Sequence, residues 1–113
     1  MSRVLFFLLF ALAAVPPASA QPEVTAVRLG EHPDKIRFVM ELSEAPRYRV
    51  FTLPDPFRVV IDLPELVWAP EAQSRFVDGK GAVSAMRFGL FAPGTSRVVL
   101  DMTGPALVKN VFV

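Results

Sequence analysis

The chain contains no cysteine and a single histidine, His32, and these two shortages exclude several kinds of chemistry. Without cysteine there is no disulfide, no thiol nucleophile and no cysteine to carry a lipid. A catalytic zinc site needs three protein ligands, commonly histidines with a carboxylate, and one histidine in a predicted turn does not supply them. No serine lies in a nucleophile elbow, and Gly79-Lys80-Gly81 is too short for a phosphate loop. We therefore predict no catalytic residue, no metal site and no cofactor.

The chain also lacks an excess of either charge, with 12 lysines and arginines against 11 aspartates and glutamates. Binding to nucleic acid depends largely on a basic surface that neutralises phosphates. The balanced charge therefore predicts no nucleic-acid partner. No second long apolar run follows residue 15, so we predict no membrane span in the mature chain.

The first 20 residues have the three parts of a signal peptide in the usual order. Arg3 supplies the positive charge, residues 4–15 form an uncharged apolar run, and Ala18-Ser19-Ala20 fits a cleavage site. The run is too short to cross a bilayer comfortably, although an uncleaved N-terminal anchor is the alternative. We expect a signal peptide over residues 1–20 with cleavage after Ala20, one domain over residues 21–113, and a periplasmic location.

What the chain does have is a segment that occurs twice. Val24-Thr25-Ala26-Val27-Arg28-Leu29-Gly30 returns as Val83-Ser84-Ala85-Met86-Arg87-Phe88-Gly89. A second block follows each copy, first Arg37-Phe38-Val39-Met40-Glu41-Leu42-Ser43 and then Arg97-Val98-Val99-Leu100-Asp101-Met102-Thr103. Internal repeats usually mean that one supersecondary unit is used more than once, because a single copy cannot bury its own apolar face.

Apolar and polar residues alternate in these blocks with the period of a β-strand. We expect strands over residues 24–29, 35–42, 48–53, 57–63, 83–89, 96–102 and 106–113. A short strand near residues 74–77 or a small helix within residues 64–81 could join them. Short strands at about ten-residue spacing, separated by Gly/Pro turns, predict an all-β sandwich or barrel.

The same alternation predicts which side chains face the core. In the second strand we expect Ile36, Phe38, Met40 and Leu42 on one face, and in the fourth we expect Phe57, Val59, Ile61 and Leu63 inward. Phe38, Phe51, Phe57 and Phe88 are expected in the core. Trp68, Tyr48 and Phe91 are expected in or beside loops, where an exposed aromatic ring can stack on a sugar, although for a single tryptophan packing is the favoured role.

The second half of the chain has one strand fewer than the first, because no counterpart of residues 57–63 follows residue 113. A β domain without its last strand has an unpaired sheet edge, where another strand can add. We expect this chain to be a fragment of a longer protein.

A pattern of arginine, valine and acid at alternate positions, here called the Arg-x-Val-x-acid motif, occurs three times. Its copies are Arg37-Phe38-Val39-Met40-Glu41, Arg58-Val59-Val60-Ile61-Asp62 and Arg97-Val98-Val99-Leu100-Asp101. The arginine and acid of one copy share the outward face but lie about 13 Å apart along the strand. Two readings stay open. The charges could pair across neighbouring strands, or they could form a ligand-binding face that Arg28 and Arg87 widen.

The order and spacing of these blocks resemble the AMIN domain, the non-catalytic N-terminal module of bacterial periplasmic N-acetylmuramoyl-L-alanine amidases and of some secretin-type proteins. The resemblance rests on residues 24–30, 37–42, 48–53, 56–63, 83–89 and 97–102, and it covers nearly all of the mature chain. It implies a small sandwich of two antiparallel four-stranded sheets with a pseudo-two-fold repeat, of which the last strand is missing here.

The resemblance also implies a function and a site. It implies a peptidoglycan-binding module that positions a cell-wall amidase at the division septum and carries no enzymatic activity of its own. The implied peptidoglycan-binding residues are Arg58, Asp62, Arg97 and Asp101, together with Arg37, whose motif carries Glu41 in place of the family's aspartate. Two alternatives are an N-terminal fragment of a zinc amidase and a domain that docks a secretin, a cell-division protein or another envelope protein.

Overall fold

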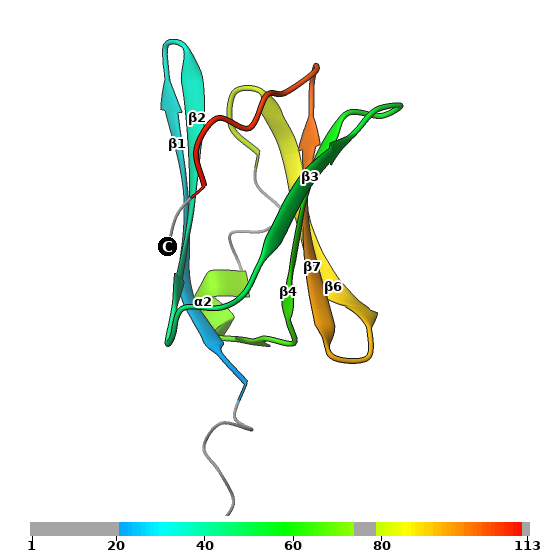
Figure 1. Cartoon of the computed structure of the whole chain (residues 1–113). Coiled ribbons are helices and arrows are strands. Elements are labelled where there is room, and N and C mark those ends of the chain that lie inside the picture. The colour runs from blue at the N-terminus through cyan, green and yellow to red at the C-terminus, as the bar shows by residue number, and fades with distance from the viewer. Residues whose placement is uncertain (1–20, 74–78, 112–113) are drawn as a thin grey trace, which may run out of the picture.

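A computed structural model describes residues 21–73 and 79–111 of the chain, and nearly all of its regular structure is β-strand. The elements in chain order are β1 (Glu23–His32), β2 (Lys35–Leu42), β3 (Arg49–Leu53), β4 (Arg58–Pro64), β5 (Val67–Trp68), α2 (Pro70–Gln73), β6 (Val83–Ala92) and β7 (Thr95–Met102). The expected all-β sandwich is confirmed, because these strands form two sheets that face each other (Figure 1).

The two sheets exchange strands between the halves of the chain. One sheet has the order β2-β1-β5, and the other has the order β3-β4-β7-β6. Strands β3 and β4 belong to the first half, yet β4 pairs with β7 of the second half. Neighbouring strands are antiparallel except β1 and β5, which pair in parallel over two residues.

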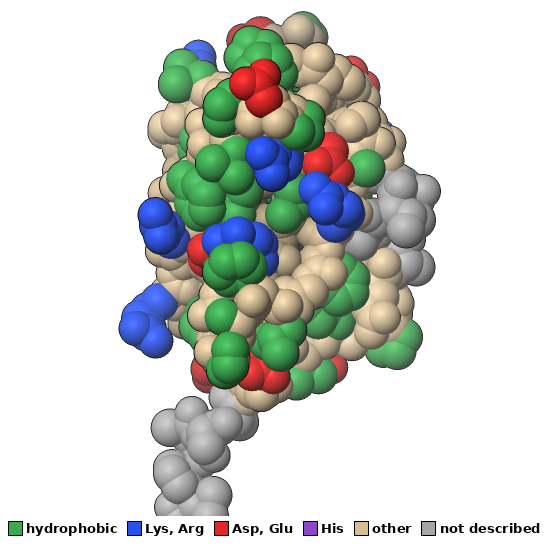
Figure 2. Space-filling view, turned by 90° about the vertical axis from the view of Figure 1, so that its right-hand side faces the viewer, with side chains coloured by type: hydrophobic (Ala, Val, Ile, Leu, Met, Phe, Trp, Pro, Cys, Tyr) green, Lys and Arg blue, Asp and Glu red, His purple; other side chains and the backbone are tan. Residues whose placement is uncertain are grey.

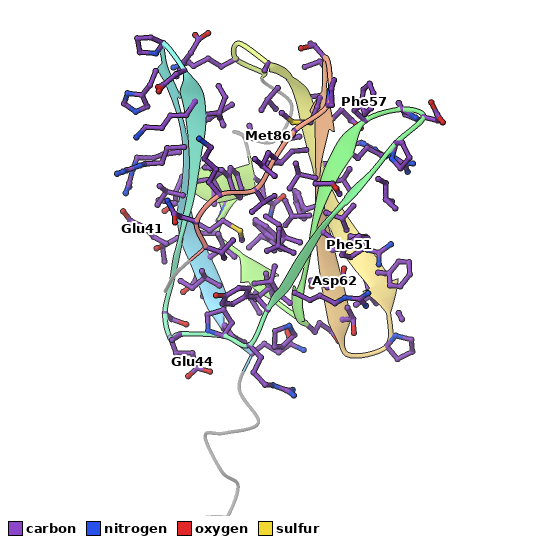
Figure 3. All side chains as sticks on the ribbon, turned by 45° about the horizontal axis from the view of Figure 1, so that its top comes forward. Glu41, Glu44, Phe51, Phe57, Asp62 and Met86 are labelled. Carbon is purple, nitrogen blue, oxygen red and sulfur yellow. The ribbon has the colours of Figure 1, made fainter. Side chains whose placement is uncertain are left out.

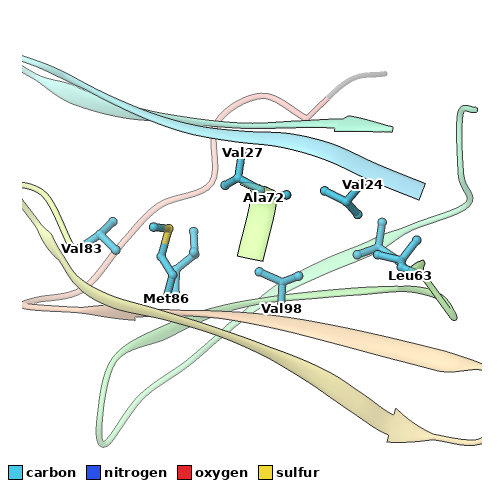
Figure 4. Close-up of a cluster of buried hydrophobic side chains, with 9 residues drawn as sticks. Val24, Val27, Leu63, Ala72, Val83, Met86 and Val98 are labelled. Atoms are coloured by element: carbon cyan, nitrogen blue, oxygen red, sulfur yellow. The ribbon is translucent and has the colours of Figure 1, made fainter. Parts of the chain in front are cut away.

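The core lies between the two sheets and draws on both halves. Figure 4 shows Val24 and Val27 of β1 opposite Met86 and Val98 of the second half. The four-residue helix α2 closes one end of the sandwich and buries Ala72 completely (Figure 1). The expected inward row of β2 is confirmed, because its four side chains contact this core: Ile36, Phe38, Met40 and Leu42.

The sequence repeat is also a structural repeat, down to its irregularities. The β1–β2 hairpin has a bulge between Val24 and Ala26, and the β6–β7 hairpin has one at the equivalent place, between Val83 and Ala85. The Ser43 N–H donates to the carbonyl of Glu23 at 2.9 Å. The equivalent bond in the second hairpin joins the Thr103 N–H to the carbonyl of Ala82, also at 2.9 Å.

Two aromatic residues predicted for the core lie elsewhere. Phe51 faces outward, because β3 places it opposite Val60 on the side of the sheet away from the core (Figure 3). Phe57 precedes β4 in the turn from β3 and is 38% exposed. The core positions of Phe38 and Phe88 are confirmed. Trp68 lies in β5 and not in a loop, but its expected packing role is confirmed, because its ring centre lies 4.1 Å from that of Phe88.

The strand expected over residues 106–113 is wrong as far as residue 111, because residues 106–111 have no regular structure. Its counterpart in the first half, β3, pairs only with β4. A strand needs a partner for its backbone N–H and C=O groups, and no counterpart of β4 lies among the described residues of the second half. The short strand considered near residues 74–77 lies outside the described residues.

Candidate functional site

Two copies of the Arg-x-Val-x-acid motif lie side by side on the outer face of the four-stranded sheet. Strands β4 and β7 are antiparallel, and their register places Arg58 opposite Asp101 and Asp62 opposite Arg97. The two central valines, Val60 and Val99, also face each other. Each arginine therefore lies opposite the acid of the other copy, but of these two cross-strand pairs only Arg97 with Asp62 forms an ion pair among the described residues.

The best-formed pair of this face is Arg97 with Asp62. The guanidinium donates from Nε to Oδ1 at 2.7 Å and from its terminal nitrogen to Oδ2 at 3.0 Å. The side chains are 24% and 15% exposed, so solvent screens this pair less than an ordinary surface pair. The hydrogen bonds from Arg97 lower the pKa of Asp62, although burial opposes the shift and Arg49 adds a smaller lowering effect. The carboxylate therefore stays charged at neutral pH.

The second acid of the face, Asp101, does not pair with the arginine opposite it. Arg87 of β6 donates two hydrogen bonds to Asp101, at 2.9 and 2.8 Å, and this contact raises the pKa of Arg87. Arg58 instead donates to the carbonyls of Pro56 and Pro54, at 3.0 and 3.3 Å, and so stabilises the turn before β4. The face is thus not symmetric, although its register is.

Aromatic rings alternate with arginines along the same face. The guanidinium carbon of Arg97 lies 3.5 Å from the centre of the Phe91 ring and 5.5 Å from that of Phe51. Arg49 lies 4.9 Å from the centre of the same Phe51 ring. Stacked cation–π contacts of this kind hold a guanidinium plane in place and leave its edge free for hydrogen bonds.

A shallow hollow of about 260 Å³ opens at the start of β3, beside Asp62. Arg47, Tyr48 and Arg49 border it on one side, and Thr95, the first residue of β7, borders it on another. All three residues of the Arg47–Arg49 stretch are exposed, and neither arginine forms an ion pair within the described residues. Figure 2 faces this side of the molecule and shows cationic side chains set among hydrophobic and acidic ones.

The third motif copy lies on the other sheet. Arg37 is exposed on β2, and it forms no ion pair within residues 21–73 and 79–111. Its motif acid, Glu41, accepts from Arg28 of β1, which is the same arrangement as Arg87 with Asp101. The five residues predicted as a site therefore divide between two outer faces: Arg58, Asp62, Arg97 and Asp101 lie on one, and Arg37 lies on the other.

Sequence reasoning missed the residues that give this face its shape. Phe51 shares a face with Arg49 because the two are two residues apart on β3, a signal that was available in the sequence. Phe91 was not predictable in the same way, because a register shift between Leu90 and Ala92 interrupts the alternation of β6. The hollow depends on which strand lies beside β4, and strand order is a tertiary property.

Two searches of the described residues give negative findings. No group of three or more histidine, cysteine, aspartate or glutamate side chains is placed to hold a metal ion in residues 21–73 and 79–111. Over the same part of the chain, no helix has the length and apolar composition that crossing a bilayer requires.

Comparison with known proteins identifies the family. A search of curated proteins finds no match for this chain. The family model of the AMIN domain matches residues 26–112, which include the first hairpin from Ala26 onward, the whole second hairpin and both motif-bearing strands of the face described above. AMIN domains are non-catalytic peptidoglycan-binding and targeting modules of amidases and secretins, and they are typically periplasmic. With its repeated hairpins and its match over most of the sequence, the chain belongs to the AMIN domain family.

Proposed function

We propose that this protein is exported with cleavage after Ala20 and binds peptidoglycan through the outer face of the β3–β4–β7–β6 sheet, so that it positions a cell-wall amidase at the division septum. The observation that carries the proposal is the joined pair of motifs on that face. Arg58, Asp62, Arg97 and Asp101 come together there from two strands, beside a hollow bordered by arginines.

The chemistry of the hollow suits the peptide part of the wall. Stem peptides of peptidoglycan carry free carboxylates, and a guanidinium presents a planar fork of donors that matches a carboxylate. Arg47 and Arg49 are exposed at the hollow and form no ion pair among the described residues, although Arg49 lies opposite Asp62 in the strand register. In the proposal these two arginines receive the ligand's carboxylate.

The Arg97–Asp62 pair has a supporting role in this arrangement. Arg97 already donates two hydrogen bonds to Asp62, and its guanidinium lies over the Phe91 ring. These contacts hold the three side chains in one geometry on the outer face of the sheet. The exposed aromatic rings of Tyr48 and Phe91 add apolar area to either side. A polymer with sugar rings and peptide amides presents both apolar and polar surface, which this mixture of side chains can contact.

The test is co-sedimentation of the purified protein with sacculi stripped of protein. We expect Arg47→Ala combined with Arg49→Ala to weaken binding by at least about tenfold, since each lost charge-assisted hydrogen bond contributes on the order of 1.5–3 kcal/mol. Both residues are exposed, so the variant keeps its core and should unfold at the same temperature as the parent protein.

The matched control is Arg28→Ala combined with Arg37→Ala. It removes the same number of positive charges, two, but from the opposite sheet. It therefore distinguishes an effect of the binding face from an effect of the lower net charge. We expect this control to bind sacculi as the parent does. Equal retention of both double variants and the parent would contradict the proposed face.

The targeting role has its own readout. A fluorescent fusion exported to the periplasm should concentrate at the septum of dividing cells, and the Arg47→Ala, Arg49→Ala variant should lose that concentration. A parent fusion distributed evenly around the cell would contradict a septal role. It would not contradict binding to the cell wall.

A further inference from the structure

A second hollow, of about 200 Å³, lies on the outer face of β6 and β7 and shares no lining residue with the hollow beside Asp62. Its lining includes Gly89 and Val99 as well as three long side chains, those of Arg87, Phe91 and Arg97. The strand register places Gly89 opposite Arg97 and Arg87 opposite Val99. The hollow therefore lies where β6 has no side chain beside Arg97.

Nothing in the backbone or the packing around Gly89 requires a glycine. Gly89 lies two residues from Arg87 and so shares its outward face. Its φ is outside the left-handed region, to which only Gly81 and Gly94 belong among the described glycines. Apart from its chain neighbours, no described atom lies within 4 Å of the place that a Cβ would take. A glycine inside a strand weakens it and often marks a place where a ligand approaches the backbone.

The equivalent glycine of the first hairpin, Gly30, has different surroundings. There the His32 side chain comes within 3.8 Å of the place that a Cβ would take. Residues 31–36 separate Gly30 from its partner Arg37, whereas residues 90–96, one more, separate Gly89 from Arg97. The extra residue accompanies the register shift between Leu90 and Ala92. The Phe91 ring between them lies 3.5 Å from the guanidinium carbon of Arg97, at the border of the hollow.

The two arginines of this hollow offer hydrogen-bond donors without an excess of charge. Arg87 is paired with Asp101, and Arg97 is paired with Asp62. Each guanidinium donates from Nε and Nη2, so its Nη1 has no hydrogen-bond partner among the described residues. The arginines of the other hollow form no ion pair, and a carboxylate is favoured there. Here the two aspartates would repel a carboxylate, and a neutral ligand is favoured.

The aromatic ring at the border narrows the class of neutral ligand further. Phe91 is 57% exposed although Arg97 lies over its ring, and the neighbouring Leu90 is 62% exposed. An exposed ring next to guanidinium donors presents an apolar face and polar groups together. A sugar ring has the matching surface, since its C–H groups form apolar faces and its hydroxyl groups lie at the rim.

We propose that the hollow over Gly89 binds a neutral sugar ring of the wall's glycan strand. The sugar packs against Phe91 and accepts hydrogen bonds from the Nη1 groups of Arg87 and Arg97. The identity of the ligand as wall glycan rests on the proposed function, whereas the preference for a neutral sugar rests on the hollow itself. The two hollows of this face then bind different parts of the wall, its glycan and its stem peptides.

The test is an NMR titration of the purified protein with chitotetraose, which has β-linked N-acetylated sugars and no peptide. We expect the backbone amide signals of Gly89 and Phe91 to shift on titration. The hollow is shallow and offers one ring and a few donors, so we expect a Kd on the order of 1 mM.

Gly89→Val is the variant that fills the hollow. Valine suits a strand, and a Cβ at this position meets no described atom beyond its chain neighbours, so the variant should unfold at the same temperature as the parent or a higher one. We expect it to bind chitotetraose at least about tenfold more weakly. Gly30→Val is the matched control, because it places the same side chain at the equivalent position of the other sheet. It should bind chitotetraose as the parent does.

Three outcomes would overturn the sugar site: no binding of chitotetraose by the parent, equal binding by Gly89→Val, or signal shifts confined to other strands. Co-sedimentation with sacculi tests the proposed function separately. A parent that binds chitotetraose at Gly89 but not sacculi would contradict wall binding and support the sugar site. A parent that binds sacculi but not chitotetraose would do the opposite.

Discussion

Asp62 and Arg97 are 35 residues apart in the chain, and they lie directly opposite each other on β4 and β7 with two hydrogen bonds between their charged groups. The contact links the two halves of the sequence, because β4 belongs to the first half and β7 to the second. It also fixes the plane of the guanidinium that stacks on Phe91.

Removing the charge of Asp62 should therefore destabilise the fold measurably. We expect Asp62→Asn to lower the free energy of unfolding by about 1.5–3 kcal/mol, the usual value for hydrogen bonds to a charged group. Urea denaturation followed by circular dichroism measures this change.

Glu41→Gln is the matched control for Asp62→Asn. Glu41 forms the equivalent pair with Arg28 on the other sheet, but the two side chains are 50% and 59% exposed. A pair so exposed contributes about 0–1 kcal/mol. Similar losses from the two variants would show that burial does not distinguish the pairs.

The stability that Asp62 contributes should depend on pH. Its pKa is lower in the folded state than in the unfolded state because Arg97 donates hydrogen bonds to the charged form. The folded protein thus binds fewer protons at this group, and the stabilisation is present above the unfolded pKa and lost as pH falls through the folded one.

The measurement is the free energy of unfolding of the parent and of Asp62→Asn from pH 7 down to pH 2. The difference between them should be complete at neutral pH and should shrink below about pH 4, where an unperturbed aspartate gains its proton. A difference that stays constant across this range would contradict the role of the charged carboxylate.

Val60 is more sensitive to substitution than its position on the outward face of β4 would suggest. The sequence places it on the outward face, yet it is 1% exposed, since Phe51 and Val99 lie on either side of it. Val60→Thr puts a hydroxyl in that covered position and should destabilise the fold by about 1–3 kcal/mol.

Val39→Thr is the control, because Val39 is the central valine of the motif on β2, which among the described residues pairs with β1 alone. It is partly exposed, so the hydroxyl can reach water, and the change should be within about 0.5 kcal/mol. Thermal unfolding of both variants gives the comparison, and equal losses would mean that the outer face does not cover Val60.

The strands and their faces were predictable where alternation was regular. The inward row of β2, from Ile36 to Leu42, follows from a period of two and contacts the core as expected. Alternation failed at Phe57, which lies in a turn, and it could not anticipate the register shift next to Phe91. The strand expected over residues 106–113 is wrong as far as residue 111, because forming a strand depends on having a partner, and propensity does not supply one.

The sequence by itself determined that the chain is β-rich, that its two halves repeat, and that arginine and acid share an outward face in three strands. Those properties are local, because they depend on which side of its own strand each residue occupies. Only the tertiary structure decided that two of the motifs lie together on one sheet and the third lies on the other sheet. Strand order and register set those distances, and they result from how the two halves exchange strands to bury one common core.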